Sequence, residues 1–303
     1  MYAVDMHSDS LSEVSGEKGL LNSYNVSSAY SHLQFFAHYS SVSGKTPEQR
    51  RRALIRAFDV YLYECERLGV KRILEGRDVF SFLEEGGVAS VFTVEGGGGL
   101  FADSPELTSL AGAGLSVLGM AWDTNELASG AFDEDDAGLT DEGRKMALRC
   151  SELGITLDVS HLSDRSFYEL FEFSPMPHIA THSNFRSVCP SRRNLTLHMA
   201  KMIASRGGVI GINLYPPFLT DSGDAGIDDV IRHIDYGLEN LGEGCVGFGF
   251  DIDGTTGKYP IDIDTKRSIH DQVINRLLSE YSSEVAERIA GMNIIEFLKN
   301  NLM

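Results

Sequence analysis

The sequence predicts an α/β fold of the (β/α)₈ barrel type. Short apolar runs rich in β-branched residues alternate with longer segments that have helix-like patterns. Most of these runs are apolar throughout, as is typical of parallel strands that are buried on both faces. The chain has 303 residues, and no repeat or low-complexity linker divides it. We therefore expect one barrel domain over residues 1–303, with a doubly wound open sheet as the alternative.

Eight strands are expected from the apolar runs. The second of them, at 70–74, has the weakest pattern. The expected strands are 2–7, 70–74, 88–94, 115–121, 154–160, 178–182, 207–214 and 245–250.

Helices are expected between the strands, and capping residues mark their ends. Pro47 suits the first turn of a long helix, and Gly69 suits its end. Ser163 and Asn194 are expected to cap two further helices. The expected helices are 47–68, 140–153, 163–173, 194–206, 227–241, 264–281 and 283–300.

Composition and charge exclude several classes of partner. Asp and Glu number 44 against 26 Lys and Arg, which gives a formal net charge of −18. Such a chain repels polyanions, so neither nucleic acid nor an anionic membrane surface is expected as a partner.

Cysteine usage and the absence of targeting patterns indicate a cytoplasmic location. The four cysteines are far apart in the sequence, which excludes a zinc–thiolate knuckle and makes a disulfide framework unexpected. We see no signal-peptide pattern and no apolar run of 18 residues.

Histidines and carboxylates follow five of the expected strands. Because the carboxyl ends of barrel strands converge on one mouth, we expect these side chains to face one cavity. Imidazole nitrogen and carboxylate oxygen suit zinc and similar divalent ions. Six ligands are more than one tetrahedral zinc ion can bind. They fit two divalent ions that share a bridging carboxylate. The six candidate ligands are His7, Asp9, Glu95, His161, His182 and Asp251.

Several motifs occur in an order that resembles the membrane (renal) dipeptidase family of zinc metallopeptidases, within the amidohydrolase superfamily. The segment SVCPSRRN at 187–194 is the most specific of them. The others are DMHSD at 5–9, VEGG at 94–97, GLT at 138–140, LDVSHLS at 157–163, THSN at 181–184, GFDIDG at 249–254 and GMN at 291–293.

The resemblance implies a distorted barrel that holds two zinc ions. By position, one ion is held by His7, Asp9 and Asp251. The other is held by His161 and His182, and Glu95 bridges the two. A hydroxide held between the ions then attacks the peptide bond of a dipeptide, whose C-terminal residue is D in many bacterial-type members. Asp251 is expected to carry the proton to the leaving amine, so Asp251 and Glu95 are the expected catalytic residues.

Two further residues are expected to contact the substrate. Arg193 matches the family's arginine that binds the free carboxylate of the dipeptide, and a guanidinium suits that role. The alternative for Arg193, and our interpretation of Arg192, is a surface arginine at the start of a helix. Trp122 stands where mammalian members have a histidine. An indole N–H donates one hydrogen bond but carries no protonic charge, so Trp122 either gives weaker help or only lines the pocket.

The expected function is therefore that of a metallo-dipeptidase. The alternative is another binuclear-metal amidohydrolase (a deacetylase, lactonase or non-peptide amidase) acting on a substrate with a free carboxylate. A metal-binding protein without catalysis is not expected, because all six ligands are present. Barrels of this kind commonly pair, which leaves a homodimer open. The remaining histidines are given no role: His32, His38, His178, His198, His233 and His270.

Overall fold

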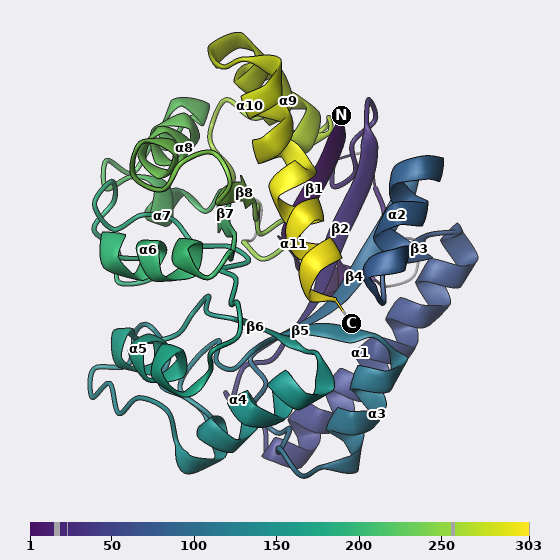
Figure 1. Ribbon diagram of the computed structural model, residues 1–303, viewed down its shortest axis with the longest axis vertical. Helices are drawn as coiled ribbons and strands as arrows, with labels where there is room; N and C mark the ends of the chain where they lie inside the picture. Colours follow the sequence, from purple (N-terminus) through teal and green to yellow (C-terminus); the bar gives the residue numbers. More distant parts are fainter. Residues whose placement is uncertain (15–18, 23, 256–257, 303) are drawn as a thin grey trace.

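The computed structural model describes residues 1–14, 19–22, 24–255 and 258–302, which form a sheet of parallel strands surrounded by helices (Figure 1). The strand order is β6-β5-β4-β2-β1-β8-β7, and β3 pairs separately with β4. Every strand pairing is parallel, as the apolar runs predicted. The strands are β1 (Tyr2–Ser8), β2 (Ser31–Tyr39), β3 (Lys71–Arg72), β4 (Val88–Glu95), β5 (Leu115–Gly119), β6 (Thr156–Asp158), β7 (Ile210–Ile212) and β8 (Val246–Phe248).

Two single bridges close this sheet into a barrel. Ile179 pairs with Asp158 at the end of β6, and Ala180 pairs with Ile210 at the start of β7. The strand expected at 178–182 is therefore reduced to these bridges, but it occupies the predicted place in the ring. The α/β barrel predicted from the sequence is confirmed.

The second barrel strand was predicted wrongly. It was expected at 70–74, whereas the structure places β2 between β1 and β4. Strand β3 covers only Lys71–Arg72 and pairs only with Ala89 and Ser90 of β4. Polar residues interrupt the apolar pattern of β2, and two of them, His32 and Gln34, form hydrogen bonds inside the protein. His32, for example, accepts a hydrogen bond from the Ser27 backbone N–H at its Nδ1 and contacts the His270 ring at 4.5 Å.

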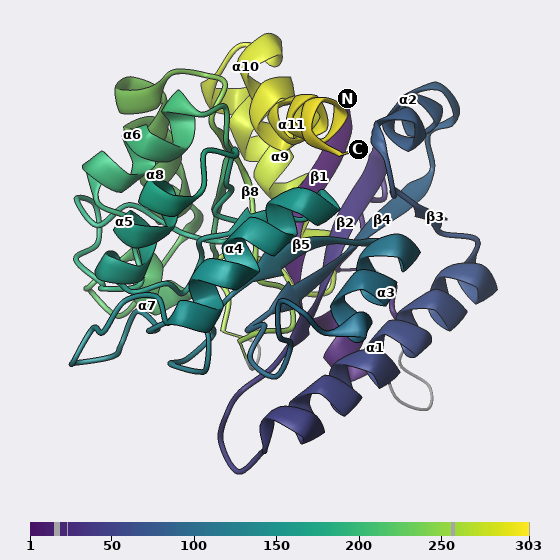
Figure 2. The same cartoon turned by 60° about the horizontal axis from the view of Figure 1, so that its bottom comes forward.

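The helices cover the outside of the barrel, and α1, α3 and α4 lie along β2, β4, β5 and β6 (Figure 2). Four of the expected helices are confirmed to within one residue, namely α1, α4, α5 and α8. The helices are α1 (Pro47–Leu68), α2 (Gly76–Glu85), α3 (Pro105–Ala113), α4 (Asp141–Leu153), α5 (Asp164–Phe173), α6 (Leu197–Ser205), α7 (Pro216–Leu219), α8 (Ile227–Leu241), α9 (Ile269–Glu280), α10 (Ser283–Glu287) and α11 (Asn293–Asn301). A 3₁₀ turn, η1 (Ser10–Glu13), follows β1, and a π-helical turn, η2 (Arg288–Met292), precedes α11.

Two helix predictions need correction. The helix expected from Asn194 begins at Leu197, because the Thr196 hydroxyl accepts the N-terminal capping bond from Met199 N–H. The Asn194 side chain instead donates to the backbone carbonyls of Cys189 and Phe218. The expected terminal pair is divided into α9, α10, η2 and α11.

Strand residues from around the barrel form a shared apolar cluster with α11. It includes Val4, Phe35, Val91, Val117 and Ile179, all 1% exposed or less. Ile294 of α11 packs against the same cluster. This packing fixes the strands relative to one another and therefore fixes where their carboxyl ends lie. None of the described helices is both long enough and apolar enough to cross a membrane.

Candidate metal centre

All six residues predicted as metal ligands lie together at the carboxyl ends of the strands. His7 belongs to β1, and Glu95 is the last residue of β4. The other four follow a strand or a bridge: Asp9 after β1, His161 after β6, His182 after the bridge at Ala180 and Asp251 after β8. The barrel closure thus brings together residues that are up to 244 positions apart.

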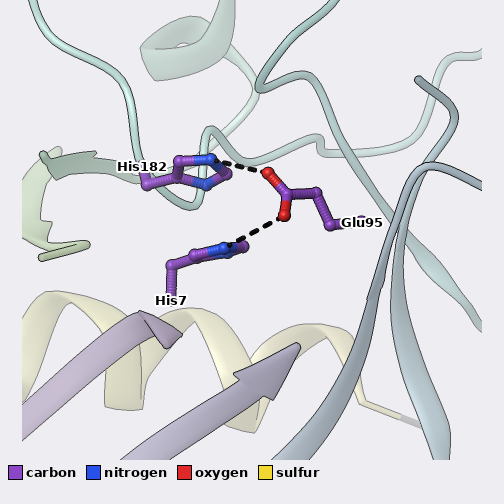
Figure 3. A group of neighbouring side chains, drawn as sticks. All are labelled: His7, Glu95 and His182. Carbon is purple, nitrogen blue, oxygen red and sulfur yellow. Dashed lines mark ion pairs between the residues drawn. The ribbon is translucent and has the colours of Figure 1, made fainter. Parts of the chain in front are cut away.

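The two carboxylate oxygens of Glu95 face different imidazoles (Figure 3). Glu95 Oε2 lies 3.5 Å from His7 Nε2. Glu95 Oε1 lies 2.7 Å from His161 Nε2 and 3.2 Å from His182 Nε2. The Nε2 atoms of His161 and His182 are themselves 2.9 Å apart. The two oxygens of Glu95 thus lie on different sides of the cluster, one beside His7 and one beside His161 and His182.

His7 also faces the two aspartates. Its Nε2 lies 4.0 Å from Asp9 Oδ1 and 3.8 Å from Asp251 Oδ1. Two sets of ligand atoms therefore lie within 4.8 Å of one another, and His7 belongs to both. One set is His7, Glu95 and His182, and the other is His7, Asp9 and Asp251.

The buried polar atoms of this cluster fit a cation. Within the described part of the chain, His7 Nε2, Asp9 Oδ1 and Glu95 Oε2 are buried and have no hydrogen-bond partner. An unpaired buried carboxylate oxygen is costly unless a positive charge compensates it. Gly254 leaves room beside the aspartates, because a Cβ there would collide with Asp251 Oδ1 and lie 2.8 Å from Asp9 Oδ2.

The electrostatics of the cluster show the same need for positive charge. Burial, together with the nearby Glu95 carboxylate, raises the pKa of Asp9 well above its usual range. Burial also raises the pKa of Asp251. Burial alone would lower the pKa of His7, but the carboxylates of Glu95, Asp9 and Asp251 outweigh it and raise it to about 10. Protons are therefore favoured on His7, Asp9 and Asp251, and a divalent ion would replace them.

Two of the ligands have an uncommon backbone conformation. His161 and Asp251 have φ values of 68° and 58°, in the left-handed region that side chains other than glycine rarely adopt. Such residues cost roughly 1–3 kcal/mol each and persist where the surrounding structure holds them. Each lies three residues beyond the end of a three-residue strand, His161 after β6 and Asp251 after β8.

A cavity of about 670 Å³ opens next to the ligands. His161 and Asp251 are among the residues that line it. Trp122 also lines it, with 37% of its surface exposed, and its ring lies 6.2 Å from that of His161. Three further aromatic residues complete the apolar part of the wall, namely Phe132, Tyr215 and Phe218.

The two neighbouring arginines differ in their surroundings. Arg193 is buried, with its Nη1 donating to Ser183 Oγ at 2.6 Å and its Nη2 to the His182 carbonyl at 2.9 Å. Its Nε is buried and has no partner among the described residues. The guanidinium packs over the ring of Phe218, which lines the cavity. Arg192 is exposed and donates to the Asp133 carbonyl, in keeping with the surface role expected for it.

Two residues near the site were not predicted from the sequence. Asn213, just after β7, donates from its Nδ2 to Asp251 Oδ2 at 3.0 Å. Tyr39 ends β2, and its ring packs edge-on against Trp122 at 5.1 Å. Both lie at strand ends, so the rule that located the ligands could have located them. The apolar pattern does not reveal Tyr39, because polar residues interrupt β2, and Asn213 carries an amide rather than an imidazole or a carboxylate.

Comparisons with known proteins agree with this geometry. Residues 9–301 match the membrane dipeptidase family (peptidase family M19). An "uncharacterized protein in pqqA 5′ region" from Klebsiella pneumoniae is 30% identical over 239 residues, covering 75% of this chain and 87% of that protein.

Two solved structures are similar over most of their length. A metallo peptidase from Rhodobacter sphaeroides, liganded with a phosphinate mimic of the dipeptide L-Ala-D-Ala, superposes with a TM-score of 0.85 at 25% identity. The superposed region covers 100% of this chain and 99% of the Rhodobacter sphaeroides chain. The metallo peptidase called dipeptidase AC gives a TM-score of 0.81 at 28% identity. The superposed region covers 89% of this chain and 86% of that chain. The chain therefore belongs to the membrane dipeptidase family of metallopeptidases and is a hydrolase of peptide bonds.

Proposed function

We propose that this protein binds two zinc ions and hydrolyses dipeptides, including those with a C-terminal D-residue. The observation that carries the proposal is the position of Glu95. Its two oxygens face separate groups of imidazoles, at 3.5 Å on one side and at 2.7 and 3.2 Å on the other. Carboxylates that bridge two ions about 3.5–4 Å apart are typical of binuclear hydrolytic sites.

The remaining ligands divide between the two sides of Glu95. His7, Asp9 and Asp251 would hold one ion, and His161 and His182 the other. Imidazole and carboxylate are the ligands that catalytic zinc prefers. When bound, the two ions supply a water of lowered pKa and polarise the carbonyl that is attacked.

Asp251 is proposed to move the proton during hydrolysis. Its carboxylate lines the cavity and is therefore within reach of a bound substrate. A carboxylate beside the proposed ions and the cavity can take a proton from water and then give it to the leaving amine. Asn213 would hold this carboxylate, because its Nδ2 donates to Asp251 Oδ2 and leaves Oδ1 on the side of His7.

Arg193 is proposed to bind the free carboxylate of the dipeptide. Its unpartnered Nε and its charge support this role, since a guanidinium binds a carboxylate strongly where water is scarce. The carboxylate would approach past Phe218, whose ring lies 5.8 Å from Arg193 Cζ. Trp122 is proposed to shape the cavity and to offer one N–H donor.

Acceptance of a D-residue is supported by the Rhodobacter sphaeroides structure, whose ligand mimics L-Ala-D-Ala. In this chain the cavity of about 670 Å³ is larger than two alanine residues need, and four aromatic side chains line it. Side chains larger than methyl would therefore have room beside the proposed ligands.

The test is a panel of matched L-L and L-D dipeptides assayed with zinc-loaded protein, with a chelator control and a count of bound zinc. We expect two zinc ions per chain and chelator-sensitive release of amino acids from both sets. Hydrolysis that survives removal of the metal, or a single bound ion at full activity, would contradict the proposal. Turnover of L-L dipeptides alone would contradict the acceptance of a C-terminal D-residue. The proposal of a two-zinc dipeptidase would stand.

A further inference from the structure

A buried carboxylate lies behind one of the proposed ligands without touching the metal space. Asp158 ends β6 and is 4% exposed. Its Oδ1 accepts hydrogen bonds from the backbone N–H groups of Ser160 and Thr181, both at 2.9 Å. Its Oδ2 accepts a hydrogen bond from the Thr181 hydroxyl. Three bonds therefore fix the orientation of this carboxylate.

The Thr181 hydroxyl links Asp158 to His182. A hydroxyl has one proton, and a carboxylate oxygen only accepts, so the proton of Thr181 is directed to Asp158. Thr181 Oγ1 also lies 2.7 Å from His182 Nδ1. Because the hydroxyl already donates its proton to Asp158, its oxygen can only accept a hydrogen bond from His182. The hydrogen of the imidazole must therefore be on Nδ1.

The opposite nitrogen of His182 faces the proposed ions. Its Nε2 lies 3.2 Å from Glu95 Oε1 and 2.9 Å from His161 Nε2. A neutral imidazole with its hydrogen on Nδ1 presents a lone pair at Nε2, which is the form that binds a metal. The hydrogen-bond chain thus selects the tautomer that the site needs.

We propose that Asp158 and Thr181 are positioning residues that hold His182 in the Nδ1-protonated tautomer and so strengthen its bond to the second ion. The inference rests on the proposed binuclear site. Partners of this kind, placed behind a metal-binding histidine, fix its ring and raise its basicity, and their loss typically lowers metal affinity about 10–100-fold.

The same residues also join two segments of the barrel, so a purely structural role has to be separated from the positioning role. Asp158 pairs with Ile179, and Val159 N–H donates to the Ile179 carbonyl. A structural role would alter stability alone. The positioning role alters the tautomer of His182 in the metal-free protein and the affinity for zinc.

Four variants separate these roles. Thr181→Val keeps the branched shape and removes the hydroxyl, whereas Thr181→Ser restores it. Asp158→Asn keeps an oxygen for the two backbone N–H groups but offers a donor to Thr181, which then directs its own proton at His182 Nδ1. Thr156→Val is the matched control, because Thr156 begins the same strand, is buried, and makes no side-chain hydrogen bond within the described residues.

Zinc affinity, measured by competition with a chelator, should fall about 10–100-fold in Thr181→Val and at least as far in Asp158→Asn. Thr181→Ser should recover most of the loss, and Thr156→Val should bind as the wild type does. In ¹⁵N-histidine NMR spectra of the metal-free protein, we expect His182 to carry its hydrogen on Nδ1 in the wild type and on Nε2 in Asp158→Asn.

The inference is overturned if Thr181→Val binds zinc as tightly as Thr156→Val, or if His182 carries its hydrogen on Nε2 in the wild type. If Asp158→Asn does not fold, the zinc affinities of Thr181→Val, Thr181→Ser and Thr156→Val still test the positioning role. A wild-type protein that binds no zinc would overturn the proposed function and the affinity arm with it. The tautomer measurement would then still decide whether the Asp158–Thr181 chain sets the proton of His182.

Discussion

The two sides of the barrel hold their ligands in different ways. On one side, His7 and Glu95 belong to long strands, since β1, β2 and β4 have 7, 9 and 8 residues. On the other side, β6, β7 and β8 have three residues each, and His182 follows a segment with only single bridges. There the ligands lie in loops rather than on regular strands.

Buried side chains replace strand pairing on the short-strand side. Asn184 Nδ2 donates to the carbonyls of Asn213 and Phe218, and Asn213 N–H donates to Asn184 Oδ1. Ladder hydrogen bonds fix a strand residue by its backbone, whereas these bonds fix loop residues by specific side chains. We therefore expect the short-strand side to be the more sensitive to single substitutions away from the ligands themselves.

The largest effect is expected where the two sides meet. Glu95→Ala removes the carboxylate that faces His7 on one side and His161 on the other, so metal loading and dipeptide hydrolysis should both be lost. Because Glu95 ends a long, fully paired strand, the midpoint of thermal unfolding of the metal-free protein should change little. Metal content, turnover and a melting curve check this. Full turnover in the variant would contradict the two-ion proposal.

Gly254→Ala tests a loop on the short-strand side. The added methyl group would collide with Asp251 Oδ1 and approach Asp9 Oδ2, so the ion held by His7, Asp9 and Asp251 should be lost. The ion on His161 and His182 should stay, which predicts about one zinc per chain in place of two. Gly244→Ala is the control, because a Cβ there meets no described atom within 4 Å. Two tightly bound ions in Gly254→Ala would contradict this prediction and would show that the loop rearranges to accommodate the methyl group.

Arg193→Ala should raise KM for dipeptides with a smaller change in kcat, because the lost bond to the substrate carboxylate is present before and during the reaction. A hydrogen bond to a charged group contributes about 1.5–3 kcal/mol, which corresponds to about 10–150-fold in kcat/KM. Arg192→Ala is the matched control from the exposed neighbouring position. An unfolded Arg193→Ala protein would instead assign this arginine to the support of His182 and Ser183, and Arg193→Lys would then be tested for KM.

An effect on stability rather than on activity is expected from pH, through the loops that His233 supports. His233 Nδ1 accepts from Phe185 N–H, and its Nε2 lies 3.1 Å from the Leu219 carbonyl. Burial lowers the pKa of His233 from 6.5 to about 4. Because the unfolded chain gains this proton first, stability present above pH 6.5 is lost as the pH falls towards 4, by up to about 3 kcal/mol.

His233→Gln removes this titration. The metal-free variant should be less stable than the wild type at pH 7, yet its free energy of unfolding should fall less between pH 7 and pH 4. Denaturant unfolding at the two pH values measures the difference. An equal fall in both proteins would mean that His233 does not contribute to acid sensitivity on this side.

Much of the site could be predicted from the sequence because the ligands obey a simple positional rule. His7, Glu95 and Asp251 each stand at the end of an apolar run, and parallel barrel strands bring such ends together. Strand β2 was not predicted because His32, Gln34 and His38 break its apolar pattern. Only the tertiary structure shows that His32 and Gln34 form a hydrogen bond and that His32 packs against the ring of His270. The cytoplasmic location and the homodimer stay predictions.

The sequence alone determined the alternation of strands and helices, the resemblance to the dipeptidase family and the six ligand types, since these follow from local pattern and residue chemistry. Only the tertiary structure decided which oxygen of Glu95 faces which imidazole, that Arg193 is buried, and that Asp158 and Thr181 lie behind His182. Distances between side chains from different strands depend on how the barrel closes, and closure depends on packing across the whole chain rather than on any one segment.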